Sequence, residues 1–258
     1  MIGRPRFSRF VFWATIVFLF MPLLVLILYS FNDSRRMAWE GFSLRWYQEL
    51  FLSSPNLWRA FGNSLVIAFA SALTATVIAT LGAIGINWYS LRIRAYVQAV
   101  SFMPLVLPEI IVGVSLLVFF AGVGLRLGLF TIYLAHTSFN LPFVLLIVLA
   151  RLEEFDYTII EASRDLGATE RQTLLRVILP VSMPGIISGF LTAFTLSLED
   201  FVITFFVSGP GSTTLPLFVY SMIRFGVSPV INALSVVIIA GTVALVLLAR
   251  RFVTYIVR

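Results

Sequence analysis

Three acidic residues stand in otherwise apolar stretches: Glu109 in the window Val97–Ala121, and Glu199 with Asp200 in the window Met183–Phe206. On insertion scales a charged side chain at the centre of a bilayer costs at least about 2.5 kcal/mol, so it is expected to face a cavity or a partner. No arginine lies at comparable depth in the apolar windows, although the whole chain has a net charge of +6. This local acidity favours a pathway for a cationic, ammonium-bearing solute over one for an anion.

Each carboxyl group also has a structural alternative. Adjacent residues on a helix point about 100° apart, so Glu199 and Asp200 need not contact one substrate, and one of them can pair across a subunit interface. Two polar stripes follow helical spacing: Thr192, Thr195 and Glu199 form the first, and Ser197, Asp200 and Thr204 form the second. Any of the three acids can instead be a protonated or hydrogen-bonded packing residue, and Glu109, directly after Pro108, can cap a helix.

Aromatic side chains and the single histidine are further candidates. Trp46 and Tyr47 follow the first apolar window, and their rings suit alkylammonium groups, although such residues gather at membrane interfaces in any case. His136 and Asn140 lie four residues apart and share a helix face. A lone histidine that points into a bundle is more often a hydrogen-bonded packing residue than a ligand.

Several kinds of chemistry are excluded by residue types. The chain has no cysteine, and all 18 basic residues are arginine. Thiolate chemistry, a lysine Schiff base and the lysine of a Walker A phosphate loop are therefore unavailable. Without a metal-ligating or catalytic constellation, we expect neither an enzyme nor a metal site. The pI of about 10.2 is better explained by loop arginines that set membrane orientation than by nucleic-acid binding.

The elements that position these residues are predicted to be transmembrane helices. The chain is 60% hydrophobic, with a mean hydropathy of +1.01, and a bilayer-spanning helix needs about 20 apolar residues. The second apolar window, Ala60–Ile86, is rich in Ala, Ser, Thr and Gly and is expected to be an inner helix of a bundle. The sequence predicts an all-α polytopic membrane protein with six spans, which run over Phe10–Ser30, Ala60–Ile86, Val97–Ala121, Leu129–Leu149, Met183–Phe206 and Asn232–Ala249.

Loop arginines predict the orientation. Twelve of the 18 gather on one side, which the positive-inside rule makes cytoplasmic, so both termini are expected inside. The predicted organisation is an N-terminal tail and first span over residues 1–31, an external segment over 32–59, a core over 60–250 with a cytoplasmic loop at 152–182, and a cytoplasmic tail over 251–258. The twelve are Arg4, Arg6, Arg9, Arg92, Arg94, Arg151, Arg164, Arg171, Arg176, Arg250, Arg251 and Arg258.

The cytoplasmic loop contains EASRDLGATERQTLLRVILP, residues 161–180. Capping boxes are expected at TIIE, residues 158–161, and at TERQ, residues 169–172. Gly167 suits a left-handed helix stop, and Pro180 is expected to end the second helix. That helix is amphipathic, since Thr173, Leu174, Val177 and Ile178 form one stripe.

This spacing resembles the EAA motif of permease subunits of bacterial ABC importers. Ser163 and Val177 replace the commoner Ala and Ile, which are small changes in volume. The resemblance implies a type I ABC importer permease fold, in which this loop is the coupling helix that docks on a cytoplasmic ATPase. The residues to which it assigns that coupling are Glu161, Ala162, Ser163, Gly167, Ala168, Glu170, Arg171, Leu179 and Pro180.

A wider resemblance covers nearly the whole chain and is closest to the spermidine/putrescine permease subunits, of the second of their two types. It is carried by YSFNDSRRMAWEGFSLRWYQEL, HTSFNLPFV, EASRDLGA, FTLSLEDFVITFFVSGPG and LPLFVYSMIRFGVSPVINAL. It implies a polyamine-like substrate and a bacterial inner-membrane location. The implied partners are a second permease subunit, two copies of an ATPase that binds ATP and Mg²⁺, and a periplasmic binding protein, with no cofactor in this chain.

Two alternatives remain at this point. One is a related importer permease for another solute, such as an iron, thiosulfate or amino-acid-derived substrate. The other is a self-sufficient secondary cation transporter or channel, in which the same carboxyl groups would bind protons or cations.

Overall fold

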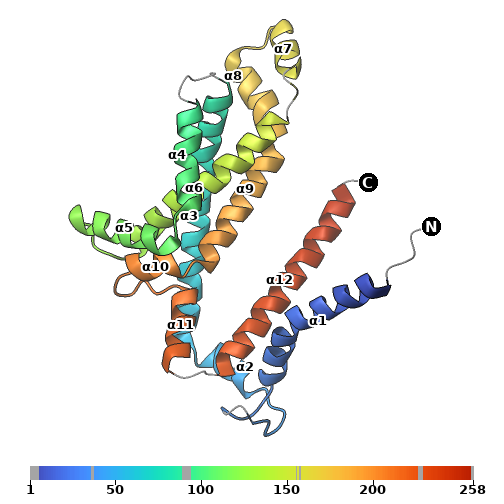
Figure 1. The fold of residues 1–258 in the computed structure, drawn as a ribbon, viewed down its shortest axis with the longest axis vertical. Helices are drawn as coiled ribbons and strands as arrows, with labels where there is room; N and C mark the ends of the chain where they lie inside the picture. The colour runs from blue at the N-terminus through green and yellow to red at the C-terminus, as the bar shows by residue number, and fades with distance from the viewer. Residues whose placement is uncertain are drawn as a thin grey trace. The chain divides into compact units, whose positions relative to one another are not determined.

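The computed structural model describes residues 6–35, 38–88, 94–154, 156, 158–225 and 229–256 (Figure 1). The predicted orientation arginines Arg4, Arg92 and Arg258 lie outside this part of the chain. The helices are α1 (Arg6–Tyr29), α2 (Arg45–Leu52), α3 (Pro55–Trp88), α4 (Arg94–Val106), α5 (Glu109–Gly122), α6 (Leu129–Glu153), α7 (Thr158–Asp165), α8 (Glu170–Thr173), a π-helical turn (Leu174–Ile178), α9 (Leu179–Glu199), α10 (Val202–Val207), α11 (Leu215–Phe225) and α12 (Pro229–Ile256).

The all-α prediction is confirmed. The described residues form no β-sheet, and their β-type pairing is limited to one isolated β-bridge between Asn32 and Phe42. In the part of the chain that the structure describes, four helical segments are long and apolar enough to cross a membrane: Phe7–Tyr29, Pro55–Asn87, Leu129–Glu153 and Glu170–Glu199. Helices suit this composition because a helix satisfies its own backbone groups where lipid offers no hydrogen bonds.

The chain divides into two compact units. The first comprises Met1–Asn56 and Val219–Arg258, and the second comprises Leu57–Phe218. In the first unit, α1 and α2 each contact α12. The apolar window of α1 is not covered by the chain itself, whereas Trp46 and Leu50 of α2 are fully buried.

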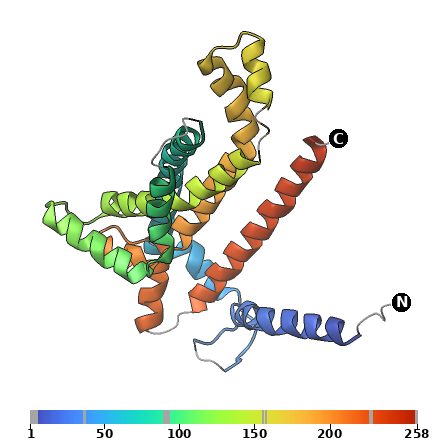
Figure 2. The ribbon, with the colours of Figure 1, turned by 45° about the horizontal axis from the view of Figure 1, so that its top comes forward.

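The second unit is organised around α6 and α9, which run side by side (Figures 1 and 2). A line of small residues on α9, at intervals of four, faces α6: Gly185, Gly189, Ala193 and Ser197 are all buried. Small residues let membrane helices approach closely. A Cβ atom at Gly185 would lie 2.7 Å from Arg151 Cβ, and one at Gly189 would lie 2.9 Å from Val144 Cγ1.

Helix α3 supplies a second small-residue face, as predicted for span two. Its buried alanines are Ala60, Ala68, Ala72, Ala75, Ala79 and Ala83. Several of them join Val144, Leu145 and Val148 of α6 in one apolar cluster. The prediction that this helix lies inside the bundle is confirmed on this face.

We expect Gly189→Ala to lower the free energy of unfolding by about 1–3 kcal/mol, because the added methyl group overpacks a rigid, β-branched neighbour. Thermal unfolding of the detergent-solubilised protein measures the effect. Gly82→Ala is the matched control, since its Cβ would lie 3.7 Å from Leu145 Cδ1, an ordinary contact. Equal destabilisation by the two substitutions would contradict a special closeness of α6 and α9.

Two predicted spans are not single helices. The third divides at Leu107 and Pro108 into α4 and α5, and Figures 1 and 2 show α5 running in a different direction from α4. Proline at 108 lacks an N–H group and restricts the residue before it, so the chain turns there. The fifth divides after Glu199 into α9 and α10, with Asp200 in an extended conformation between them.

Candidate functional site

The break between α9 and α10 is built around the Asp200 carboxylate. Oδ2 accepts hydrogen bonds from the Thr204 backbone N–H and the Thr204 hydroxyl, both at 2.8 Å. Oδ1 accepts from the Ile203 N–H at 3.3 Å. The first turn of a helix has N–H groups without helical partners, and a carboxylate satisfies them. Asp200 therefore ends one helix and caps the next.

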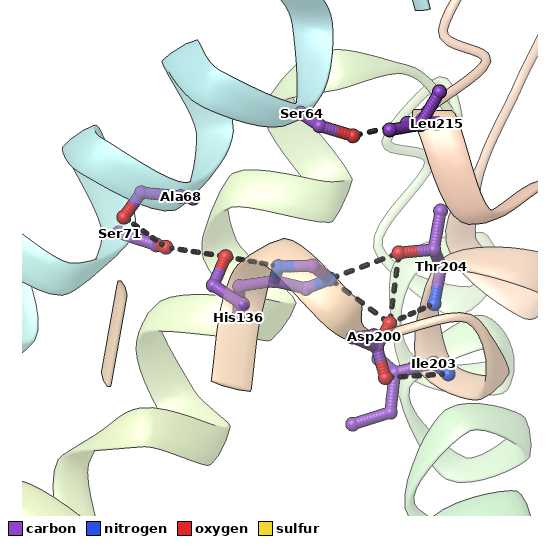
Figure 3. A network of polar contacts seen from close by, with 9 residues as sticks. Ser64, Ala68, Ser71, His136, Asp200, Ile203, Thr204 and Leu215 are labelled. Atoms are coloured by element: carbon purple, nitrogen blue, oxygen red, sulfur yellow. Dashed lines mark hydrogen bonds and ion pairs between the residues drawn. The ribbon is translucent and has the colours of Figure 1, made fainter. Parts of the chain in front are cut away.

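His136 of α6 connects this cap to the rest of the bundle (Figure 3). Its Nε2 lies 3.1 Å from Asp200 Oδ2 and 3.0 Å from Thr204 Oγ1, and its Nδ1 lies 2.6 Å from Ser197 Oγ. The Ser71 hydroxyl of α3 donates to Ser197 Oγ at 3.1 Å. The side chains of His136 and Asp200 are 1% and 4% exposed. We call these five residues the polar network; they join α3, α6, α9 and α10.

One assignment of hydrogens satisfies the chain of contacts in the polar network. Ser71 donates to Ser197, Ser197 donates to Nδ1 of a neutral His136, and Nε2–H donates to the Asp200 carboxylate. The order serine, histidine and carboxylate is also that of hydrolytic triads. Here all three side chains are buried, so a substrate has no access and the arrangement serves to hold helices.

Glu199 directly precedes Asp200 in the chain, but its environment is the opposite of the buried one around Asp200. It is exposed and makes no hydrogen bond or ion pair with the described residues. The exposed line Met183, Ile187, Leu191, Thr195 and Glu199 is displaced by two residues from the buried glycine line, which is about 200° on a helix. Packing of α9 on α6 therefore directs Glu199 away from α6.

The third predicted acid, Glu109, lies elsewhere in the same unit. It is exposed in the first turn of α5, directly after Pro108, where a carboxylate complements the helix dipole. A cavity of about 300 Å³ among α3, α4 and α6 is lined by apolar side chains with Ser101 and Ser138, and none of the three acids reaches it. The described residues contain no cluster of three potential metal ligands.

Trp46 and Tyr47 of α2, in the first unit, pack against the chain that directly follows α1. The Trp46 indole N–H donates to the Asn32 carbonyl, and the guanidinium carbons of Arg35 and Arg45 lie 5.7 and 5.1 Å from its ring centroid. Tyr47 is half-buried, and its hydroxyl lies 2.8 Å from Ser30 Oγ. The contacts shown for both residues are structural, and their role in substrate passage remains a prediction.

The predicted coupling loop is a helical hairpin. Gly167 has φ +83°. The Gly167 N–H donates to the Arg164 carbonyl at 2.8 Å, and the Ala168 N–H donates to the Ser163 carbonyl at 3.0 Å. This pair of bonds is a Schellman motif, the helix end that a left-handed glycine permits. Gly167 therefore ends α7 as predicted.

The capping box at residues 169–172 is also confirmed. The Gln172 N–H donates to Thr169 Oγ1 at 3.3 Å, and the Thr169 N–H donates to Gln172 Oε1 at 2.9 Å. The two arms of the hairpin are joined where Ser163 Oγ lies 3.1 Å from Thr173 Oγ1. Ile160 and Ile178 are buried in the apolar cluster of α3, α6 and α9, so the hairpin is packed on the bundle.

Two local predictions for this loop are wrong. Thr158 does not cap α7; it is the first helical residue, and its N–H donates to Asp156 Oδ1 at 3.0 Å. Nor does the helix stop at Pro180. The Leu179 N–H donates to the Leu174 carbonyl, which makes a wide π-helical turn directly before the proline. Such a turn accommodates the missing N–H, so the helix continues into α9.

The hairpin presents most of the predicted coupling residues at its surface. Glu161, Ala162, Gly167, Glu170, Arg171 and Pro180 are exposed, and Ser163, Ala168 and Leu179 are half-buried. Sequence analysis did not single out Leu166, which is 89% exposed at the tip. The feature of the sequence that could have identified Leu166 is its position as an apolar residue directly before the helix-ending glycine. The sequence predicted a packing role for His136 but not its hydrogen-bond partners, because those partners lie more than 60 positions away in the chain.

Comparisons with known proteins agree with this architecture. Residues 73–258 match the family described as "Binding-protein-dependent transport system inner membrane component". The chain is 38% identical over 251 residues to the spermidine/putrescine transport system permease protein PotC of Escherichia coli (strain K12), covering 97% of this chain and 94% of the relative. It is 42% identical over 254 residues to the putrescine transport system permease protein PotI of the same strain, covering 90% and 87%.

The fold is also found in solved structures. A chain from a bacterial ABC transporter involved in the import of the acidic polysaccharide alginate aligns with a TM-score of 0.69 at 14% identity, covering 92% of this chain and 94% of that one. This confirms the expected ABC importer permease fold. The chain belongs to the family of binding-protein-dependent transport system inner membrane components.

Proposed function

We propose that this chain is one of two permease subunits of an ATP-driven importer, and that it forms half of a transmembrane pathway for polyamines. Its relatives PotC and PotI carry spermidine and putrescine in their names. The observation that carries the proposal is Glu199, a carboxylate in an apolar span that is exposed and unpaired among the described residues. A charge in that position is expected to face a pathway or a partner subunit.

The electrostatics of this helix end favour a cation. Glu199 is the last residue of α9, where the helix dipole contributes the equivalent of about half a negative charge. The hydroxyls of Thr192 and Thr195 donate to the carbonyls of Ser188 and Leu191 within the helix, so they add polarity on the same side without positive charge. An ammonium group that leaves water is stabilised by such an arrangement, and an anion is repelled.

The hairpin of residues 158–178 is the proposed docking surface for the ATPase. It combines exposed charges with exposed apolar side chains, since Leu166, Ile159 and Leu175 are 89%, 47% and 49% exposed. Apolar residues surrounded by polar ones mark protein interfaces. Because Ile160 and Ile178 fix the hairpin to the bundle, movement of a docked partner would reach α6 and α9 as a rigid-body displacement.

The chain is expected to work with a second permease subunit, two copies of an ATPase that binds ATP and Mg²⁺, and a periplasmic binding protein. It would bind no cofactor itself. The hairpin is proposed to lie on the cytoplasmic side together with both termini, which agrees with the distribution of arginines.

Uptake of labelled spermidine and putrescine by the complete transporter tests the proposal. Glu199→Gln is expected to lower uptake about tenfold, since neutral glutamine keeps the shape and removes the attraction for the ammonium group. Glu199→Asp keeps the charge and is expected to retain most of the activity. Glu40→Gln, at an exposed position of the external segment, is the matched control and is expected to leave uptake unchanged.

Three outcomes would contradict the proposal. Unchanged polyamine uptake by Glu199→Gln would exclude the acidic pathway. Competition by an unrelated solute and none by polyamines would indicate another substrate. Uptake by this chain alone in liposomes would show that it needs no partner.

A further inference from the structure

Two adjacent carboxyl groups, those of Glu199 and Asp200, have opposite environments. The side chain that contacts only the second of them is His136, which comes from another helix, α6. Asp200 is enclosed by Thr204, Ile203 and His136, whereas Glu199 faces away from α6. The peptide bond between the two acids is also the point at which the α9 helix ends. Any displacement of Asp200 therefore moves Glu199.

We propose that His136 is a positioning residue for substrate passage: by holding Asp200 in the break between α9 and α10, it fixes the end of α9 and so keeps the Glu199 carboxylate in the direction that packing of α9 on α6 gives it. This rests on the proposed function, because Glu199 is the group assigned to the pathway there. Among the described residues His136 makes no hydrogen bond to Glu199, and it acts through Asp200 and Ser197.

The geometry explains why a histidine suits this position. Its two nitrogens contact residues on either side of Glu199: Nδ1 meets Ser197 in the last turn of α9, and Nε2 meets Asp200 and Thr204 beyond the helix end. One flat ring thus spans the break from α6, and Ile132 and Ala135 of α6 are fully buried beside it. A side chain with a single polar atom would hold one side of the break only.

A double-mutant cycle in the complete transporter tests the inference. His136→Leu is expected to lower uptake per assembled transporter about tenfold, and His136→Gln, which keeps an N–H donor near the Nε2 position, should retain at least about half of it. Adding Glu199→Gln to His136→Leu should lower uptake by less than about twofold further, because an already misdirected carboxylate contributes little. Full additivity of the two losses would overturn the inference.

Thr204→Val provides a second variant in case His136→Leu does not assemble. It removes a hydroxyl from the polar network with little change in volume. In its presence, as in that of His136→Leu, Glu199→Gln is expected to cause a smaller loss of uptake than it causes in the wild type. If Thr204→Val assembles normally and leaves that effect at its full size, the inference is overturned.

A chemical measurement separates this inference from the proposed function. The chain has no cysteine, so a Glu199→Cys variant carries one thiol, and its reaction with a membrane-impermeant reagent reports the position of the side chain. His136→Leu should change that rate at least about threefold, while the rate at the exposed control position Phe42→Cys stays constant. An unchanged rate at position 199 would overturn the inference even if Glu199 proves essential for uptake. A changed rate together with normal transport by Glu199→Gln would support the positioning of this side chain by His136 and contradict its part in substrate passage.

Discussion

Replacing Asp200 with leucine is expected to lower the free energy of unfolding by about 3–5 kcal/mol, because it removes the acceptor of several buried hydrogen bonds. Four donors then lose their acceptor: the Ile203 N–H, the Thr204 N–H, the Thr204 hydroxyl and the Nε2–H of His136. Each donor left unsatisfied in an apolar interior costs about 1–3 kcal/mol. Thermal unfolding in detergent and the yield of assembled transporter measure the loss.

Asp156→Leu is the matched control for this prediction. Asp156 also accepts a backbone N–H at a helix start, that of Thr158, but it is exposed. That hydrogen bond lowers the pKa of Asp156 below its ordinary value of 3.8. The cap is therefore formed at neutral pH and is lost only as the pH falls below that value. A much smaller loss is expected for Asp156→Leu, because water replaces the carboxylate as acceptor at an exposed helix start. Equal losses at the two positions would show that burial of the network contributes nothing.

Gly167→Val is expected to reduce uptake by at least about tenfold while the spans remain folded, since a β-branched residue rarely adopts positive φ. A Cβ atom at Gly167 would meet nothing within 4 Å, so the effect comes from the backbone at φ +83°. Strain of about 1–3 kcal/mol would displace the turn between α7 and α8. The hairpin would then present a different surface to the ATPase. Uptake and ATP hydrolysis by the complete transporter are the measurements.

Two further substitutions test whether the effect of Gly167→Val comes from the backbone conformation at this position. Gly167→Asn should retain most of the uptake, because asparagine tolerates the left-handed conformation. Gly241→Val in α12 introduces the same side chain at a glycine without positive φ and without close neighbours, and uptake should stay near the wild-type level. If valine and asparagine at position 167 behaved alike, the left-handed turn would not be the part of the hairpin that matters.

Much of the fold follows from local pattern. Apolar windows placed α1, α3 and α6 to within about five residues at each end, and the positions of Gly167 and Thr169 predicted the turn and the cap of the hairpin. These features depend on interactions between residues close in the chain, so the sequence contains their causes. Prolines were harder to interpret, because Pro108 ends a helix whereas Pro180 lies inside one. The difference depends on whether the preceding turn can widen.

The sequence by itself determined that three acids lie in apolar surroundings and that Ser197, Asp200 and Thr204 share one line. It also determined that an arginine-rich chain without lysine or cysteine carries neither a Walker A site nor thiolate chemistry. Only the tertiary structure decided which of the adjacent acids is buried. Helical spacing gives the angle between Glu199 and Asp200, but the face that meets α6 is set by the contact of Gly185 and Gly189 with that helix. The charge of Asp200 is then satisfied by a histidine 64 positions away.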